Sequence, residues 1–356
     1  MKKVILLLVM FFCLELIADN PLQNCGFPVP KTDFDPRIYN CLKTDIAPII
    51  DGQINDEAWQ KADWTGSFVD IEGDLQPLPT METKAKILWD DENLYFAAQM
   101  EEPQLWATLL QHDSVIYRDN DFEVFLDPDW DTQNYYEMEM NAFNTTWELL
   151  ITQTYYEKDC HAIDGWDIAG MRTAVHLNGT LNDPQDTDTG WTLEIALPWQ
   201  ALEECSSHNG APESGEMWRM NFSRVEWDLN VIDGKYQKQE KPEHNWVWSP
   251  QGIIAMHYPE MWGVLVFCED RSQFQTEIPR LQYVDKLRKI YYIQKGYFQQ
   301  HNCYATLAQL AAIPGYNNIV QGFSIFLTPN GYEALYQDEN MSCTVRQDRK
   351  MTFREN

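Results

Sequence analysis

Aromatic side chains gather in one short stretch, NWVWSPQGIIAMHYPEMWG, which runs from Asn245 to Gly263. It holds three tryptophans and one tyrosine beside the adjacent pair Met256 and His257. Aromatic rings can cover the apolar C–H face of a pyranose, while polar groups at fixed angles replace the water on its hydroxyls. The same rings suit a hydrophobic core. The stretch therefore indicates either a ligand-holding surface or core packing, and we expect Trp262 to be buried and His257 to be partly exposed.

Three aspartates alternate along LDPDWDTQ, at Asp127, Asp129 and Asp131. This alternation of hard oxygen donors is typical of calcium-binding loops. An Asp-Pro-Asp run is also a common turn sequence that needs no metal. A calcium ion at this loop is one expectation and a metal-free turn is the other, and we expect no further cofactor.

Residue patterns that carry catalysis are missing. The sequence contains no nucleophile elbow, no HExxH helix, no Gly-rich phosphate loop and no CxxC pair. A glycosidase would need two carboxylates that face one cleft, but with 55 Asp and Glu residues some such pair can always be found. We therefore expect a protein that is not an enzyme.

Charge restricts the partners. The 356 residues are 44% hydrophobic, which is enough for a sizeable core, and 26 Lys and Arg against 55 Asp and Glu give a formal net charge of −29. Such a surface repels nucleic acid and anionic lipid headgroups. A neutral ligand such as a sugar, a cation, or solubility alone would suit this charge.

The first residues, MKKVILLLVMFFCLELIADN, join two lysines to an apolar run that ends at the small residue Ala18. This predicts a secretory signal peptide over residues 1–18, with an uncleaved membrane anchor as the alternative. No later segment is apolar over the length that a membrane span needs. We expect a secreted, periplasmic or cell-surface protein.

Seven cysteines follow the predicted signal peptide, and their scattered spacing disfavours zinc. Cys25 with Cys41, and Cys303 with Cys343, are candidate disulfides in an exported protein. Because the count is odd, at least one thiol must be free. The sequence leaves the pairing open.

Short apolar and aromatic runs alternate with polar turns from about residue 37 to residue 267. The run FEVFL and the alternating Tyr136, Met138 and Met140 show the two-residue period of strands. We predict an all-β fold, a β-sandwich of about ten strands. Four tryptophans in strand-like or turn-flanked patterns are expected in its core: Trp59, Trp89, Trp191 and Trp199.

The character of the chain changes after Asp270. One helical stripe over residues 279–300 is formed by Val284, Leu287, Tyr291 and Phe298. Charged residues occupy the opposite side, which predicts an amphipathic helix. We expect three segments after the signal peptide: an N-terminal lead over residues 19–44, the sandwich over 45–270, and a C-terminal helical extension with a small tail over 271–356.

Six stretches of the chain resemble carbohydrate-binding module family 9, and more closely its secreted bacterial "family 9-like" members. In order, they are IDGQINDEAWQKADW, ILWDDENLYFAAQMEEPQLWATLLQHDS, RDNDFEVFLDPDWDTQNYYEMEMNAFNTTWELL, GWDIAGMRTAVHLNGTLNDPQDTDTGWTLEIALPWQAL, RMNFSRVEW and NWVWSPQGIIAMHYPEMWG. The resemblance runs from about Ile50 to Phe267. It implies a β-sandwich, a sugar-binding role that is frequently exercised beside glycan-degrading enzymes, and structural calcium in some members.

The resemblance also implies site residues. By position, the carboxylate that holds a terminal sugar falls on Glu123, the neighbouring amide on Asn141, and one aromatic wall on Tyr117. Where the family has an arginine, this chain has Glu139. Glu123 lies inside an otherwise apolar strand, so it would need a partner if it faced the core.

The second aromatic wall of the family has no clear counterpart, because the matching position falls on Met256 or His257. Trp106, Trp246 and Trp248 are then the substitutes that the sequence offers. The candidate sugar site therefore combines the residues of the previous paragraph with Trp106, Trp248 and His257.

The expected function is non-catalytic binding of an oligo- or polysaccharide, linked to polysaccharide catabolism. A haem-binding electron-transfer module of the same sandwich type is one alternative. Met256 and His257 are adjacent and would point apart on a strand, so a haem would need a ligand from His112, Met171 or His176 opposite one of them. A structural surface protein without a ligand is the other alternative, since one tryptophan wall is missing.

Overall fold

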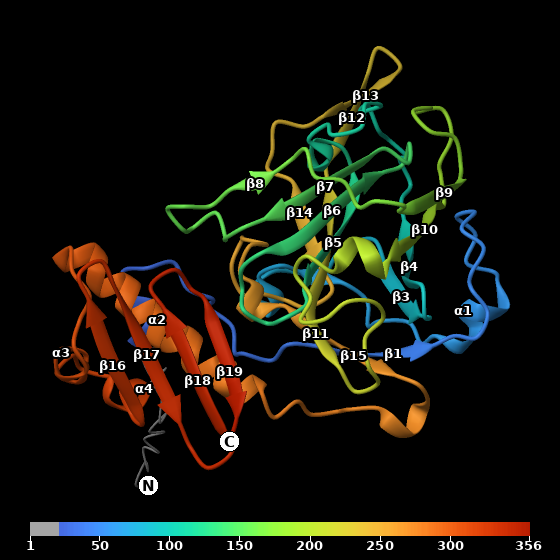
Figure 1. Ribbon diagram of the computed structural model, residues 1–356. Helices are drawn as coiled ribbons and strands as arrows, with labels where there is room; N and C mark the ends of the chain where they lie inside the picture. Colours follow the sequence, from blue (N-terminus) through green and yellow to red (C-terminus); the bar gives the residue numbers. More distant parts are fainter. Residues whose placement is uncertain (1–20) are drawn as a thin grey trace, which may run out of the picture.

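The computed structural model describes residues 21–356, so the predicted signal peptide lies outside the described residues. Thirteen strands form one sheet, in the order β8-β7-β6-β5-β11-β15-β1-β3-β4-β10-β9, with β14 joining β11 to the short β2. Neighbours are antiparallel except that β1 runs parallel to both β15 and β3. The sheet curls so that its two halves face each other (Figure 1). The prediction of an all-β sandwich is confirmed.

The strands of this sheet are short and regular. Their bounds are β1 (Ile38–Lys43), β2 (Val69–Asp70), β3 (Thr83–Trp89), β4 (Asn93–Glu101), β5 (Asp121–Asp127), β6 (Tyr135–Asn141), β7 (Thr146–Ile151), β8 (Ala162–Ile163), β9 (Arg172–Asn178), β10 (Gly190–Pro198), β11 (Met217–Glu226), β14 (His244–Val247) and β15 (Gly263–Cys268). A separate hairpin is made by β12 (Leu229–Ile232) and β13 (Lys235–Lys238), and α1 (Glu57–Lys61) is a single helical turn.

The core between the two halves comes from the alternation of the strands. Phe122, Val124 and Leu126 of β5 point inward and pack with residues of β3, β4 and β10, such as Phe96 and Ile195. Burying these apolar side chains is the main favourable contribution to folding. The other residues of β5 therefore point to the outer face of the same sheet, where a pocket lies.

The tryptophans expected in the core are buried there. Trp59, Trp89, Trp191 and Trp199 each have an exposed fraction of 3% or less, and Trp262 has none. His257 is half-buried. The stretch from Asn245 to Gly263 thus contributes Trp262 to the packed interior and keeps His257 partly accessible, as expected.

The C-terminal extension folds as a layer of its own. The long helix α2 (Leu281–His301) precedes the short helices α3 (Leu307–Ala311) and α4 (Asn317–Val320). A four-stranded antiparallel sheet follows: β16 (Phe323–Thr328), β17 (Gly331–Gln337), β18 (Met341–Arg346) and β19 (Met351–Glu355). This sheet lies beside the sandwich (Figure 1). The predicted helix is confirmed, and the predicted tail is a complete small sheet.

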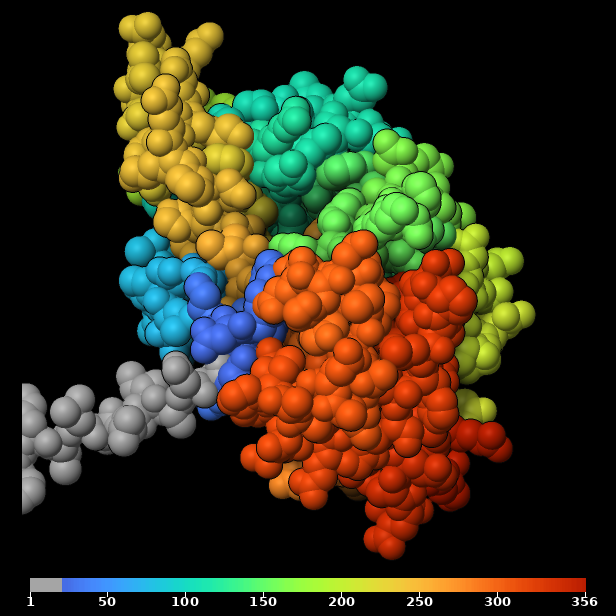
Figure 2. Space-filling view, turned by 90° about the vertical axis from the view of Figure 1, so that its left-hand side faces the viewer, coloured from blue at the N-terminus to red at the C-terminus, as the bar shows by residue number. Residues whose placement is uncertain are grey.

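Helix α2 is covered on more sides than one apolar stripe would allow. Tyr291 and Tyr292 are adjacent in sequence and both fully buried. Both rings contact Phe27 of the N-terminal segment, with ring centres 5.8 and 6.1 Å apart. Gly296 lies against this segment so closely that a β-carbon would collide with the carbonyl oxygen of Cys25. The N-terminal segment therefore helps to seal the C-terminal layer, and the two touch in Figure 2.

A buried ion pair joins the C-terminal layer to the sandwich. Arg349, in the turn between β18 and β19, donates from Nη1 to both carboxylate oxygens of Glu260, at 2.9 and 3.1 Å. The hydroxyl of Tyr292 donates to Glu260 at 2.7 Å. Both charged side chains are fully buried. This contact fixes the C-terminal layer to the end of the sandwich that leads into β15.

The cysteines are free thiols in the structure. Neither Cys25 with Cys41 nor Cys303 with Cys343 is bonded, and all seven cysteines of residues 21–356 are unpaired. Cys25 and Cys41 are buried in different hydrophobic clusters, which keeps them apart. Within the same residues, none of the helices is both long and apolar enough to cross a membrane.

Candidate functional site

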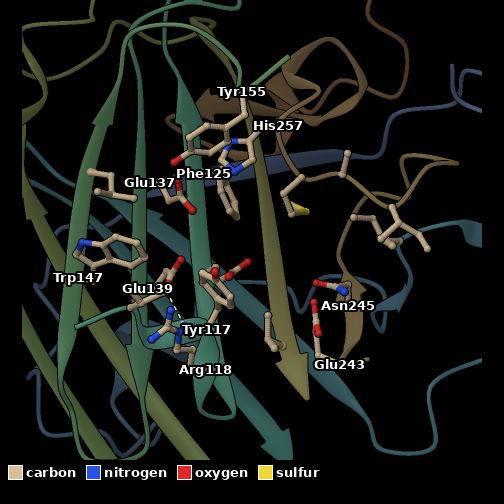
Figure 3. Close-up of a pocket in the computed structure, with 18 residues that line it drawn as sticks. Tyr117, Arg118, Phe125, Glu137, Glu139, Trp147, Tyr155, Glu243, Asn245 and His257 are labelled. Carbon is tan, nitrogen blue, oxygen red and sulfur yellow. Dashed lines mark hydrogen bonds between the residues drawn. The ribbon is translucent and has the colours of Figure 1, made fainter. Parts of the chain in front are cut away.

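A pocket of about 460 Å³ lies on the outer face of β5, β6 and β7. Its floor is formed by strand residues, and its rim by the 3-10 turn Ile116–Arg118, the loop after β7 and the loop between β14 and β15. Figure 3 shows ten of its side chains, with Trp147 and the two glutamates of β6 on one side and Asn245 and Glu243 on the other. The remaining lining residues are Ile71, Val115, Glu123, Leu149, Val225, Ile254, Ala255 and Met256.

Four of the residues predicted for the site meet in this pocket: Tyr117, Glu123, Glu139 and His257. Tyr117 is 39% exposed at the rim, and its backbone amide donates to Oε2 of Glu139 at 2.8 Å. Glu123 of β5 lies directly opposite Glu139 of β6 in the strand register. The antiparallel pairing of two strands thus brings together residues that are sixteen positions apart.

Three of the predicted residues lie elsewhere. The amide of Asn141 is fully buried and makes four hydrogen bonds within the chain, two as donor and two as acceptor, which hold the turn after β6. Trp248 is 2% exposed in the core, beside Phe222. Trp106 packs with Leu229 in a small separate cluster. We leave these three out of the candidate site because none of them lines the pocket.

The aromatic walls come from β7 and the loop that follows it. Trp147 lies opposite Glu139 in the register, so its side chain stands on the pocket face. Tyr155 is half exposed, and its ring meets the ring of His257 edge-on with centres 4.3 Å apart. These rings lie around the pocket with Tyr117 on the opposite rim (Figure 3). The hairpin alternation that places Glu139 is the signal that would have identified Trp147.

Four buried carboxylates lie together here: Glu123, Glu137 and Glu139 line the pocket, and Asp121 of β5 lies beside them beneath it. Burial raises the pKa of Glu123 to about 7. Burial also raises the pKa of the other three well above the usual range, and the nearby charge of Glu123 adds to this effect. A group of carboxylates this close cannot all ionise without a positive charge nearby.

His257 does not supply that charge. Burial lowers its pKa to about 3, so its ring is neutral at physiological pH. Its Nδ1 lies 2.8 Å from the hydroxyl of Tyr135. Met256 lies next to it with its sulfur 3.0 Å from the amide of Gln251. The three residues proposed as a second haem ligand, His112, Met171 and His176, are not among the residues that line this pocket.

The aspartates of the β5–β6 turn come together as the sequence suggests. One carboxylate oxygen from each of Asp127, Asp129 and Asp131 lies within 4.8 Å of the others. Burial and the other two charges raise the pKa of Asp127, and the pKa of Asp129 rises to about 6. Lys350 Nζ lies 2.7 Å from Asp131, so the chain itself brings a positive charge to this loop. The calcium site predicted here stays a prediction.

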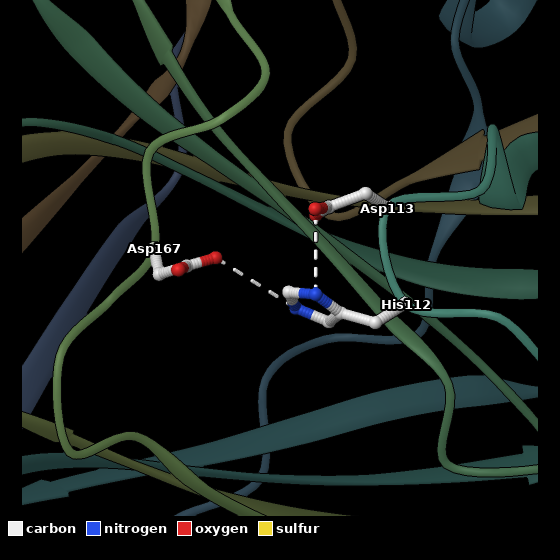
Figure 4. A group of neighbouring side chains, drawn as sticks. All are labelled: His112, Asp113 and Asp167. Carbon is white, nitrogen blue, oxygen red and sulfur yellow. Dashed lines mark ion pairs between the residues drawn. The ribbon is translucent and has the colours of Figure 1, made fainter.

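A third group of possible metal ligands lies on the surface, and it includes a histidine that can carry a positive charge. His112 lies between Asp113 and Asp167, at 3.4 and 3.9 Å (Figure 4), and its Nε2 is 3.1 Å from the buried carboxylate of Glu148. The pKa of His112 is raised although burial opposes this, because Glu148 accepts a hydrogen bond from the ring. The raised pKa makes His112 a positive charge that the chain itself can bring to these carboxylates.

Comparison with known proteins identifies the sandwich. A model of the carbohydrate family 9 binding domain-like family matches residues 50–268. The chain belongs to this family. The match covers the sandwich from the segment before α1 to the end of β15, and it leaves β1 and the C-terminal layer outside.

Two curated relatives and one solved structure are similar to part of this chain. Exoglucanase XynX of Acetivibrio thermocellus is 25% identical over 155 residues, and endo-1,4-β-xylanase A of Thermotoga neapolitana is 26% identical over 156 residues. Each match covers 44% of this chain and 12% of the relative. A family 9 carbohydrate-binding module from Caldicellulosiruptor kristjanssonii, in complex with cellotriose, is 17% identical with a TM-score of 0.43; the match covers 68% of this chain and 99% of that one.

Proposed function

We propose that this protein binds carbohydrate without catalysis, in the pocket on the outer face of β5, β6 and β7. The observation that carries the proposal is the combination of Trp147, Tyr155 and Tyr117 around a floor of carboxylates. The rings offer flat apolar faces to a pyranose, and the carboxylates accept hydrogen bonds from its hydroxyls. Membership of a carbohydrate-binding family supports the same reading.

The ligands to test first are β-1,4-linked oligosaccharides. The curated relatives are an exoglucanase and an endo-1,4-β-xylanase, and the matched segments are a small part of each. We propose that the present chain is exported and binds a polysaccharide of the kind that such enzymes break down.

Calorimetry with cello- and xylo-oligosaccharides tests the proposal. Glu123→Ala should weaken binding by about 1 to 3 kcal/mol, the scale for the loss of a charged hydrogen-bond partner. Tyr117→Ala should weaken it by a comparable amount because it removes a stacking face. If both variants bind as the wild type does, the sugar does not occupy this pocket; if no oligosaccharide binds the wild type, this ligand class is excluded.

A further inference from the structure

Two carboxylates that line the pocket, and a third beside them on β5, are arranged as the ligands of one small cation would be. One oxygen from each of Asp121, Glu123 and Glu139 lies within 4.8 Å of the other two. This separation is at most about twice a Ca–O bond of 2.3 to 2.6 Å, so one ion between them can touch all three. The strands fix this arrangement, because Glu123 and Glu139 are directly opposite and Asp121 is two residues before Glu123 on the same face.

The chain itself does not neutralise these carboxylates. Among residues 21–356, no Lys, Arg or His nitrogen lies within 4.0 Å of a carboxylate oxygen of Asp121, Glu123, Glu137 or Glu139. Arg118 lines the pocket too, but its side chain is exposed. Elsewhere, Glu226 is paired with Arg224 at 2.8 Å. The pocket floor therefore lacks a counter-charge that other buried acids of this chain have.

Glu137 provides a second observation that points to a ligand. It is 4% exposed, it lines the pocket, and its Oε2 is buried without a hydrogen-bond partner. Oδ2 of Asp121 is likewise buried without a partner. Figure 3 shows Glu137 beside Glu139 on the pocket side of β6. Buried polar atoms are normally satisfied, so these two oxygens indicate a missing partner.

We propose that Asp121, Glu123 and Glu139 bind a calcium ion at the floor of the pocket, with Glu137 beside it. The donors are all oxygen atoms, which calcium prefers and zinc does not. The negative charges on the floor also exceed what one ammonium group of a ligand would balance. Because the ion takes six to eight ligands, its pocket side remains open to water or to another oxygen ligand.

The ion would make the sugar site calcium-dependent, and this second step rests on the proposed function. Hydroxyls of a bound sugar would complete the coordination of calcium and would replace water there. The aromatic rim would hold the sugar above the ion. Calcium binding itself requires no sugar, so the two steps can be tested apart.

Equilibrium dialysis of the wild type against about 1 mM calcium, in the range used by extracellular calcium sites, tests the first step. The double variant Glu123→Gln with Glu139→Gln keeps the side-chain volumes and removes two charges. We expect it to bind one calcium ion fewer per molecule than the wild type. Asp129→Asn in the β5–β6 turn is the matched control, because it alters the other group of acids and should leave the pocket ion in place.

Thermal unfolding shows whether the variant is folded. In EDTA, the double variant should unfold at or above the temperature of the wild type, since fewer buried charges repel one another. Addition of calcium should raise the unfolding temperature of Asp129→Asn and shift that of the double variant less. Equal calcium stoichiometry in wild type and double variant would overturn the inference, as would a wild type that binds no calcium.

Calorimetry with a sugar that binds the wild type tests the second step. Chelation of calcium should lower the affinity at least tenfold, and calcium should restore it. Sugar binding that is indifferent to calcium would remove the coupling while leaving the proposed sugar site intact. Calcium binding without any sugar binding would leave the ion site intact and count against the proposed function. If glucosamine, but neither calcium nor a neutral sugar, binds through Glu123 and Glu139, the counter-charge is an ammonium group and the inference is wrong.

Discussion

Two places in the described part of the chain bury acidic side chains in different ways. At the junction with the C-terminal layer, Glu260 is fully buried but meets Arg349 and the hydroxyl of Tyr292. On the pocket floor, Glu123 and Glu139 are as deeply buried and face each other without a cation from the chain. At the junction, the chain itself supplies the positive charge that Glu260 needs. At the pocket, the negative charges must be neutralised by protons or by a ligand.

Glu260 is a buried charge that has its partner within the chain, whereas the acids at the pocket have no such partner among the described residues. Removing one partner of a buried pair leaves an uncompensated charge, which is strongly destabilising. Removing one of several like charges that repel one another relieves the others. Substitutions at the two places should therefore change stability in opposite directions, although both replace a buried charged residue.

The largest effect is expected at the junction. Arg349→Ala should lower the free energy of unfolding by about 3 to 5 kcal/mol, because Glu260 then remains buried without its partner. Urea denaturation followed by tryptophan fluorescence measures this. Arg346→Ala, at the end of β18, removes a partly exposed pair with Asp348 and should cost less than about 1 kcal/mol. Equal losses in both variants would mean that the junction pair has no special role.

The contribution of Glu123 to the free energy of unfolding should depend on pH. In the folded state Glu123 has a pKa of about 7, above its ordinary 4.5. The folded protein thus binds more protons than the unfolded chain across this interval, so stability is greatest below it and falls as pH rises through it. We expect the wild type in EDTA to lose about 1 to 3 kcal/mol more than Glu123→Gln between about pH 5 and pH 7. Parallel pH profiles for the two proteins would contradict this assignment.

The aromatic rim can be tested with two adjacent tyrosines. Tyr155 lines the pocket, whereas the neighbouring Tyr156 packs against Tyr258 outside it. Tyr155→Ala should weaken sugar binding by about 0.5 to 1.5 kcal/mol through the loss of a stacking ring. Tyr156→Ala should leave the affinity unchanged in the same calorimetric titration. The reverse result would place the sugar on the other side of this loop.

The smallest effect is expected at Trp106, which the sequence offered as a ligand residue. Its ring packs with Leu229 and Tyr236 away from the pocket. Trp106→Phe should change the sugar affinity by less than about 0.5 kcal/mol, since it shares no partner with the site. A larger loss in titrations of the folded variant would show that the sugar extends to this second cluster.

Much of the fold could be predicted from the sequence, because alternation in runs such as FEVFL specifies strands and the six ordered stretches specify the family. The helix was predicted at nearly its observed bounds, 279–300 against Leu281–His301. Its burial on several sides was not, since a stripe pattern shows one contact face and the cover from Phe27 depends on a segment 250 residues earlier. The candidate disulfides failed for a similar reason: spacing along the chain does not say which cluster a cysteine joins.

The candidate site was predicted in part. The family resemblance predicted the positions of Tyr117, Glu123 and Glu139, and these three residues lie in one pocket. Trp147 was missed because the strand alternation was not followed from β6 into β7, where the hairpin register places Trp147 opposite Glu139. Trp248 was proposed because an indole in an aromatic stretch can face either way, and only the packing against Tyr39 and Phe222 decides it.

The position of Arg349, 89 residues after Glu260, has a consequence for biosynthesis. A chain that leaves the ribosome from its N-terminus presents the complete sandwich, with Glu260, well before the turn that carries Arg349 is made. During that interval the acid end of the sandwich lacks its cation, and the apolar faces that later meet α2 and the C-terminal sheet stay uncovered. Such a chain completes this buried ion pair only after the segment that carries Arg349 has been synthesised, so the sandwich gains its last stabilising contact late.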